Sequence, residues 1–161
     1  MTATEEETLR SAVHAVWDNW PAPPPEQIQP LAYWPAEVWT AFAGVAPMDV
    51  DLGSLGFLQA TPLQQLPPKS AAAYLGTYLL SFLEGAETQM RTGLFYDLTT
   101  RAHLLSCLTA PGFWKEVIEA EVPSDGREVL RQFISYLAKH APAFAVTPED
   151  LAAMQAFAAK K

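Results

Sequence analysis

The chain has 161 residues, of which half are hydrophobic and 17% are charged, and its formal net charge is −8 at pH 7. This composition predicts a folded globular chain rather than a disordered one, and the length suits a single domain with a substantial core. A single cysteine, Cys107, excludes an intramolecular disulfide framework and favours a reducing compartment.

Acidic residues are concentrated in the first part of the chain. Residues 1–60 hold eight acids against one base, Arg10, whereas residues 61–161 hold ten acids and nine bases. The acidic part would repel a phosphate backbone, so we expect no nucleic-acid binding. No basic region followed by a hydrophobic run marks a secretory signal, and no apolar stretch reaches the ~20 residues that span a bilayer. These features predict a cytoplasmic protein that does not enter a membrane.

The first predicted helix covers residues 5–20. Thr4 and Glu7 have the spacing of a capping box, in which each side chain binds the other residue's backbone N–H. Apolar residues then recur on one helical face: Leu9, Val13, Val16, Trp17 and Trp20. Pro21 ends the helical pattern.

The segment 21–30 contains five prolines and can neither continue a helix nor donate within a sheet. We expect it to form an extended strap across the surface. A short helix is predicted from Pro35 to the glycine at position 44, and residues 45–60 then lose all periodicity and read as a loop.

The most apolar predicted helix is central, at about 68–84. It carries no charge from Ser70 to Leu83, and Tyr74 and Leu80 extend the apolar surface beyond the main stripe. A helix that is apolar nearly all round is typical of one buried by its neighbours.

Four further helices are predicted, over residues 97–109, 111–122, 124–140 and 148–160. Asp97, Ser124 and Thr147 are expected to cap the first, third and fourth of them. In the first, one face is expected to hold Leu98, Ala102, Leu105 and Leu108. No segment shows sustained strand alternation, so the sequence predicts an all-α single domain, 1–161, with six or seven helices around the central one.

Three segments carry a resemblance: LPPKSAAAYLGTYLLSFL (66–83), PSDGREVLRQFISYL (123–137) and TPEDLAAMQAF (147–157). In these core and capping patterns the chain resembles a family of small uncharacterised bacterial all-helical domains. The resemblance implies an all-α fold and a bacterial origin, and it implies no catalytic residues.

No complete catalytic or metal-binding motif is present. Asp49 and Asp51 begin like a calcium loop, but the twelfth position is Ala60, where a bidentate glutamate is required. We therefore assign no catalytic residue, no metal ligand and no cofactor.

The best of the incomplete sets is Thr99, His103 and Cys107, whose i, i+4 spacing places them on one flank of the 97–109 helix. His103 could activate the thiol, although a buried free cysteine usually behaves as a small hydrophobe. One hypothesis is therefore a small-molecule-binding or enzymatic domain with a pocket near His103 and Cys107 and near Tyr74 or Tyr78.

Four of the five tryptophans, Trp17, Trp20, Trp34 and Trp39, lie in the acidic first part of the chain. They could pack the first helices onto the central one, or some could remain exposed beside the acids as a binding face. Under the second interpretation the face would contain Trp20, Tyr33, Trp34, Asp49 and Asp51.

This distribution supports the leading hypothesis, a non-catalytic protein-binding domain such as an immunity or antitoxin-type inhibitor or an adaptor. Its partner would be a protein, and a basic one would suit the acidic face. A homodimer built on an amphipathic helix is compatible with either hypothesis.

Overall fold

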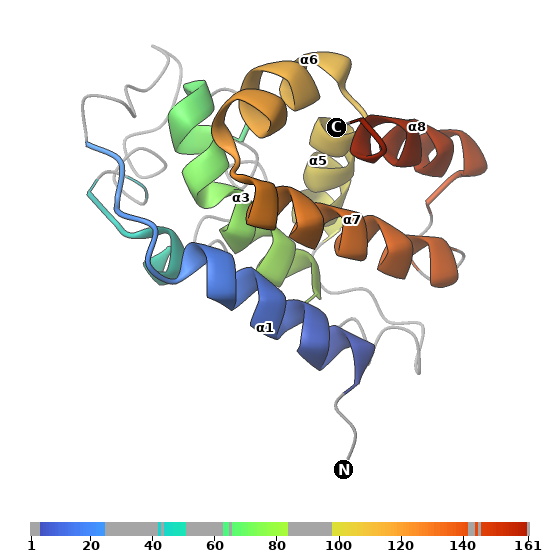
Figure 1. Ribbon diagram of the computed structural model, residues 1–161, viewed down its shortest axis with the longest axis horizontal. Helices are drawn as coiled ribbons and strands as arrows, with labels where there is room; N and C mark the ends of the chain where they lie inside the picture. The colour runs from blue at the N-terminus through green and yellow to red at the C-terminus, as the bar shows by residue number, and fades with distance from the viewer. Residues whose placement is uncertain are drawn as a thin grey trace.

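A computed structural model describes residues 4–24, 42, 44–50, 63–64, 66–83, 98–141, 144 and 146–160, without the side chains of 98–100. The helices are α1 (Glu5–Trp17), the 3-10 turn η2 (Pro47–Asp49), α3 (Pro68–Leu83), α5 (Leu98–Leu108), α6 (Pro111–Phe113), the π-helix η4 (Trp114–Glu119), α7 (Ser124–Lys139) and α8 (Pro148–Ala158). These described ranges contain no strand, which confirms the all-α fold (Figure 1). None of these helices is long and apolar enough to cross a membrane.

The capping signals at the helix starts are confirmed where the structure describes them. Thr4 and Glu7 form the reciprocal capping box of α1. Thr147 Oγ1 accepts the N–H of Asp150 at 3.1 Å at the start of α8. The predicted cap at Ser124 is wrong, because α7 already begins at that residue and its N-cap is Pro123, which makes no side-chain cap bond. Asp97, the predicted cap of α5, lies outside the described residues.

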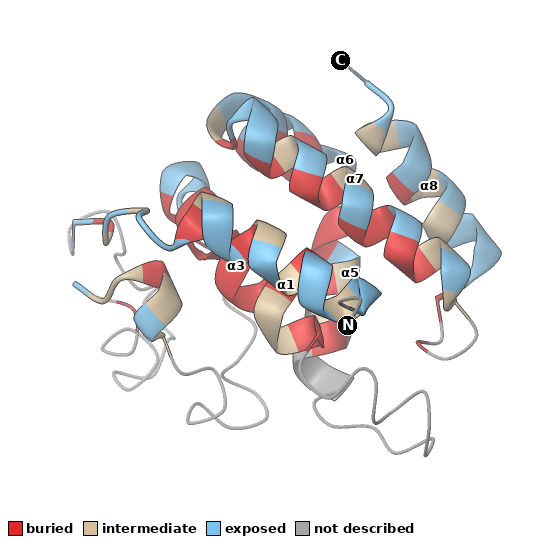
Figure 2. Cartoon of the chain, turned by 60° about the horizontal axis from the view of Figure 1, so that its bottom comes forward, coloured by how far each residue is buried: buried red, intermediate tan, exposed pale blue. Residues whose placement is uncertain are grey.

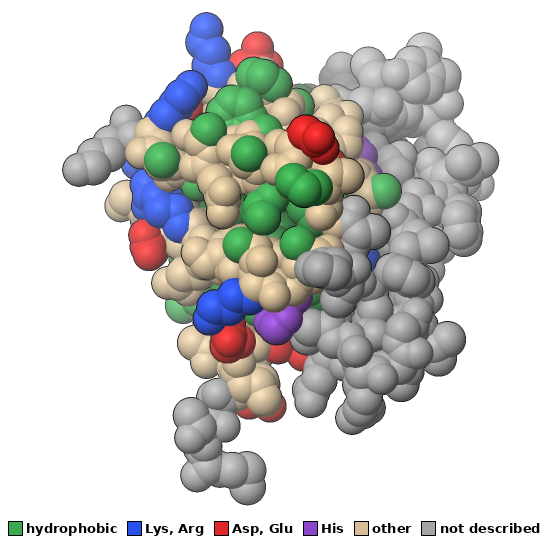
Figure 3. All heavy atoms as spheres, turned by 90° about the vertical axis from the view of Figure 1, so that its right-hand side faces the viewer, with side chains coloured by type: hydrophobic (Ala, Val, Ile, Leu, Met, Phe, Trp, Pro, Cys, Tyr) green, Lys and Arg blue, Asp and Glu red, His purple; other side chains and the backbone are tan. Residues whose placement is uncertain are grey.

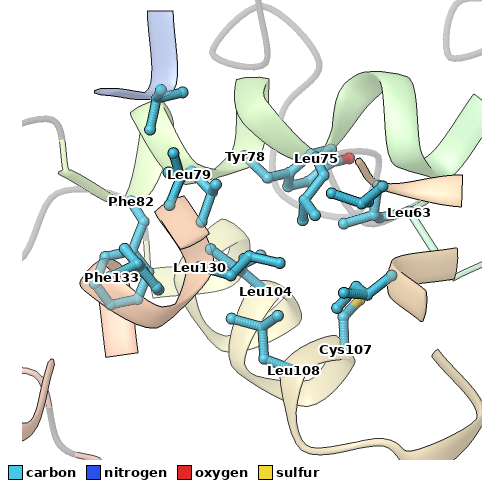
Figure 4. Close-up of a cluster of buried hydrophobic side chains, with 14 of the residues drawn as sticks. Leu63, Leu75, Tyr78, Leu79, Phe82, Leu104, Cys107, Leu108, Leu130 and Phe133 are labelled. Carbon is cyan, nitrogen blue, oxygen red and sulfur yellow. The ribbon is translucent and has the colours of Figure 1, made fainter. Parts of the chain in front are cut away.

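The central helix was predicted closely. α3 spans Pro68–Leu83, and nearly every residue from Ser70 to Leu83 is buried (Figure 2). It packs against α1, α5, η2 and η4. Figure 4 shows its Tyr78, Leu79 and Phe82 in one buried cluster with Leu104, Cys107 and Leu108 of α5 and with Leu130 and Phe133 of α7.

Other helices differ from the prediction in length, face or type. α1 ends at Trp17, one turn before the predicted end, and Trp20 lies in the segment that follows. Ala102 of α5 is exposed, whereas Leu104 and Cys107 are buried, so the inner face of this helix is rotated from the predicted one. The segment predicted as one α-helix over 111–122 contains the π-helix η4.

Phe42 is buried, and Gly44, the predicted helix stop, lies in a turn with a φ of 74°, a conformation that favours glycine. The rest of the predicted helix before Gly44 lies outside the described residues. Of the predicted strap, the structure describes only 21–24, which is not helical. The rest of the strap and the loop from 51 lie outside the described residues.

Helix α1 packs closely on α3. Trp17 is fully buried, and its indole Nε1 donates to the carbonyl of Ala72 at 3.0 Å. Gly76 lies under the same ring, and a Cβ at position 76 would stand only 2.4 Å from Trp17 Cγ. The absence of a side chain at Gly76 therefore sets how closely α1 approaches α3.

We expect Gly76→Ala to lower the free energy of unfolding by about 1–3 kcal/mol, the usual cost of overpacking a tight core. Alanine is the better helix former by up to ~1 kcal/mol, which offsets only part of this loss. Urea unfolding measures the difference. Gly112→Ala is the matched control, because a Cβ there meets nothing within 4 Å. A Gly76→Ala protein as stable as the Gly112→Ala protein would contradict the assignment.

Candidate functional site

The structure brings together three of the four residues of the predicted pocket, at the contact between α3 and α5. The rings of Tyr78 and His103 lie 5.8 Å apart between centroids. Cys107 Sγ lies 3.8 Å from His103 Nε2, as the i, i+4 spacing requires. The side chain of Thr99 lies outside the described part of the structure.

His103 forms a hydrogen bond with the backbone. Its Nε2 accepts the N–H of Leu63 at 3.1 Å, so this nitrogen carries no proton and the neutral ring has its proton on Nδ1. Burial lowers the pKa of His103 to about 4. At neutral pH the ring is therefore uncharged and its acceptor nitrogen is occupied.

Cys107 is fully buried, and burial raises the pKa of its thiol to about 12. A reactive cysteine needs a depressed pKa and a positive neighbour. The pKa of this thiol is raised, and its neighbour His103 is neutral. The pair has the properties of a packed structural contact rather than of a nucleophile and its base.

Tyr74, the fourth residue of the predicted pocket, points toward the segment that precedes α3. Its hydroxyl lies 2.7 Å from the carbonyl oxygen of Phe42 and 3.0 Å from that of Val45, and it donates to both. Burial raises the pKa of Tyr74 to about 12, so the hydroxyl keeps its proton. One turn further along, Thr77 Oγ1 donates to the carbonyl of Pro47. These hydroxyls hold Phe42, Val45 and Pro47 against α3 and do not line a site with His103.

Arg101 of α5 is a buried cation that contacts the end of α3. Arg101 Nε donates to the carbonyl of Phe82 at 3.2 Å, and its guanidinium lies 5.3 Å from the ring centroid of Phe82 and 5.6 Å from that of Phe144.

The acidic and aromatic candidates are described only in part. Trp20 is half-buried, and its ring stacks on that of Trp17 at 5.9 Å between centroids with an interplanar angle of 9°. Asp49 is exposed in η2, which lies at the same end of the molecule as the end of α1 (Figure 1). Tyr33, Trp34, Trp39 and Asp51 lie outside the described residues.

A groove of about 360 Å³ lies between α1 and α7 and was not anticipated from the sequence. Its walls include the exposed ion pair between Lys139 Nζ and Glu5 Oε2, 3.1 Å apart. A second exposed pair, Arg131 with Glu128, also lines it. No group of three histidine, cysteine or acidic side chains within the described ranges could hold a metal ion.

Comparisons of the chain with protein-family models, with curated proteins and with solved structures found no match. The geometry of the described residues is therefore the basis for assigning a function.

We expect the buried neutral His103 to make the protein less stable in acid. Its pKa is about 4 in the folded state, against ~6.5 in the unfolded chain. Between these values only the unfolded chain binds the proton, so stability is full above pH ~6.5 and is lost as the pH falls toward 4. The full shift corresponds to about 3 kcal/mol.

The measurement compares urea unfolding of the wild type and of His103→Gln at neutral pH and near pH 4.5. The glutamine carbonyl can still accept the Leu63 N–H but cannot titrate, so the variant should lose less stability on acidification. Ser106→Gln, an exposed change on the same helix, should behave as the wild type. Equal losses in wild type and His103→Gln would show that this histidine is not responsible.

We expect Cys107 to resist alkylation by iodoacetamide at neutral pH in the folded protein and to react readily in urea. Burial removes access and keeps the thiol protonated. Mass spectrometry of the labelled chain follows the reaction. If the folded protein reacts as fast as the unfolded one, the prediction is wrong and the result supports a pocket near Cys107.

Proposed function

We propose that the chain is a non-catalytic protein-binding domain, an immunity or antitoxin-type inhibitor or an adaptor, whose partner contacts the surface around Trp20 and Asp49. One observation carries the proposal: the Trp20 ring is held in a fixed stack and is nevertheless not fully buried.

The stack gives Trp20 the properties of a binding anchor. Tryptophan is among the residues that dominate protein interfaces. The Trp17 ring beneath it is immobilised by its bond to Ala72 and by the close approach of Gly76. Because the orientation of Trp20 is already set, its side chain loses little conformational entropy when a partner binds.

Charge around this surface favours a basic partner. Asp49 is exposed, and the first 60 residues carry eight acids against one base. Asp18 lies near Trp20 in the chain and pairs with His14 at 2.7 Å. Complementary charge speeds encounter and discriminates between partners.

The state of the alternative pocket supports the non-catalytic part of the proposal. His103 is neutral with its acceptor nitrogen occupied, and the Cys107 thiol is protonated. Neither group is poised for nucleophilic or acid–base catalysis at neutral pH.

Affinity capture from the native host should recover a basic protein in stoichiometric amount with the wild type. Titration calorimetry with that purified partner should show binding weakened by at least about tenfold in Trp20→Ala, the effect of removing a central aromatic anchor. Asp49→Asn should weaken binding less, and mainly at low salt.

Glu119→Gln removes one exposed charge from η4 and is the matched control. It should leave the affinity unchanged, and circular dichroism should show that all variants are folded. Failure to recover any stoichiometric partner, or an affinity that Trp20→Ala does not alter, would contradict the proposal. A toxin or nuclease encoded by the neighbouring gene would favour the inhibitor over the adaptor.

A further inference from the structure

Helix α8 carries a second apolar face, which is less buried than the face that packs on α7. Between Asp150 and Lys160 its only polar residue is Gln155. The first face packs on α7 through its buried Met154, flanked by half-buried Leu151 and Ala158. A helix that is apolar on several sides is normally covered on several sides.

The second face consists of Ala152, Ala153, Ala156 and Phe157, at the i, i+1, i+4, i+5 positions of one continuous surface. Ala152 and Ala156 are exposed, and Ala153 and Phe157 are half-buried. The Phe157 ring is held in place by Trp114, 5.8 Å away between centroids. Figure 3 looks onto the side of the molecule where α8 lies and shows hydrophobic side chains gathered there between charged ones.

Charged residues of opposite sign lie at the two ends of this face. Exposed Glu149 lies in the first turn of α8, and exposed Lys160 lies two residues after the last residue of the helix, Ala158. Lys160 Nζ lies 5.6 Å from the centroid of the Phe157 ring. The two positions differ by eleven residues, or about 16 Å along a helix. The C-cap residue Ala159 keeps a right-handed helical conformation, so Lys160 lies about three turns from Glu149 on the same side of α8.

We infer that this face binds a second copy of the chain, with α8 packed antiparallel to its symmetry mate. Reversing the direction of α8 about the midpoint between residues 154 and 155 exchanges Glu149 with Lys160 and Ala152 with Phe157. It also exchanges Ala153 with Ala156. In an antiparallel pair Glu149 meets the Lys160 of the other copy, and by symmetry each helix makes this contact twice. Antiparallel helix dipoles add to the attraction.

The sizes of the facing side chains also match under this symmetry. Phe157 faces Ala152 of the other copy, and Ala153 faces Ala156, so a large ring lies opposite a small residue at both ends of the contact. Small residues let the two helices approach closely, and the ring fills the space beside them. Such mutual complementarity is what a two-fold interface requires and what an unrelated partner would match only by coincidence.

This surface is separate from the one proposed for the protein partner. α8 lies on the opposite side of the molecule from the end of α1 and from η2 (Figure 1). A single helix pair buries less than the roughly 1,200 Å² of a standard interface, so we expect a weak, concentration-dependent dimer.

Sedimentation equilibrium over a wide range of protein concentration tests the inference. The wild type should show a reversible monomer–dimer equilibrium. Ala156→Glu, which places a charge at the centre of the contact, should abolish the dimer, whereas Ala15→Glu, an equally exposed change on α1, should not. A wild type that is monomeric throughout, or a dimer that persists in Ala156→Glu, would overturn the inference.

Reversing the charges at Glu149 and Lys160 in separate variants gives a second test. Its expected result, recovery of association on mixing, cannot be produced by unfolded variants. Glu149→Lys and Lys160→Glu should each dimerise about tenfold more weakly than the wild type, because each loses both inter-copy ion pairs. Mixed together, the two variants should form a heterodimer tighter than either homodimer, since every charged contact between them is then attractive. A mixture that associates no better than the separate variants would show that the helices do not pair in this way.

Discussion

The contact of Trp17 with Gly76 determines the positions of three helices. The indole ring lies where a Cβ on α3 would stand, and its N–H donates to the carbonyl of Ala72 on the same helix. The far edge of the ring lies 3.5 Å from the place of a Cβ at Gly126, the position through which α7 approaches α1. One side chain thus fixes α1 against both α3 and α7. The stack of Trp20 on Trp17 extends this fixed geometry to the surface.

Polar groups on and around α3 are used to satisfy buried backbone rather than to build a catalytic site. Hydroxyls of Tyr74 and Thr77 bind the carbonyls of Phe42 and Pro47, which precede α3 in the chain. Arg101 binds the carbonyl of Phe82 near the end of the helix. The imidazole of His103 accepts the N–H of Leu63. Each contact removes an unpaired backbone group from the interior, where it would cost free energy. A histidine and a cysteine in contact therefore do not indicate catalysis when both are needed, uncharged, for packing.

The sequence predicted what depends on local pattern. The bounds of α3, the capping box of Thr4 and the start of α8 at Thr147 follow from residues within a few positions of each other, and the structure confirms them. The orientation of α5, the π-helical turn η4 and the partner of Arg101 depend on which helix lies opposite, and no single-sequence pattern contains that information. His103 shows the same limit, because its state is set by a backbone N–H forty residues away in the chain.

The two proposed surfaces have different physical origins, and they reinforce each other. The Trp20 surface arises from a stack that keeps an aromatic ring oriented without covering it, whereas the α8 face arises from an apolar helix whose second side the described residues cover only in part. Because they lie on opposite sides of the molecule, a dimer formed through α8 leaves both Trp20 surfaces accessible (Figure 1). Such a dimer presents two identical anchors, and a multimeric or repeated partner would gain avidity without any new contact. A weak self-association can therefore strengthen partner binding even though it buries none of the residues that contact the partner.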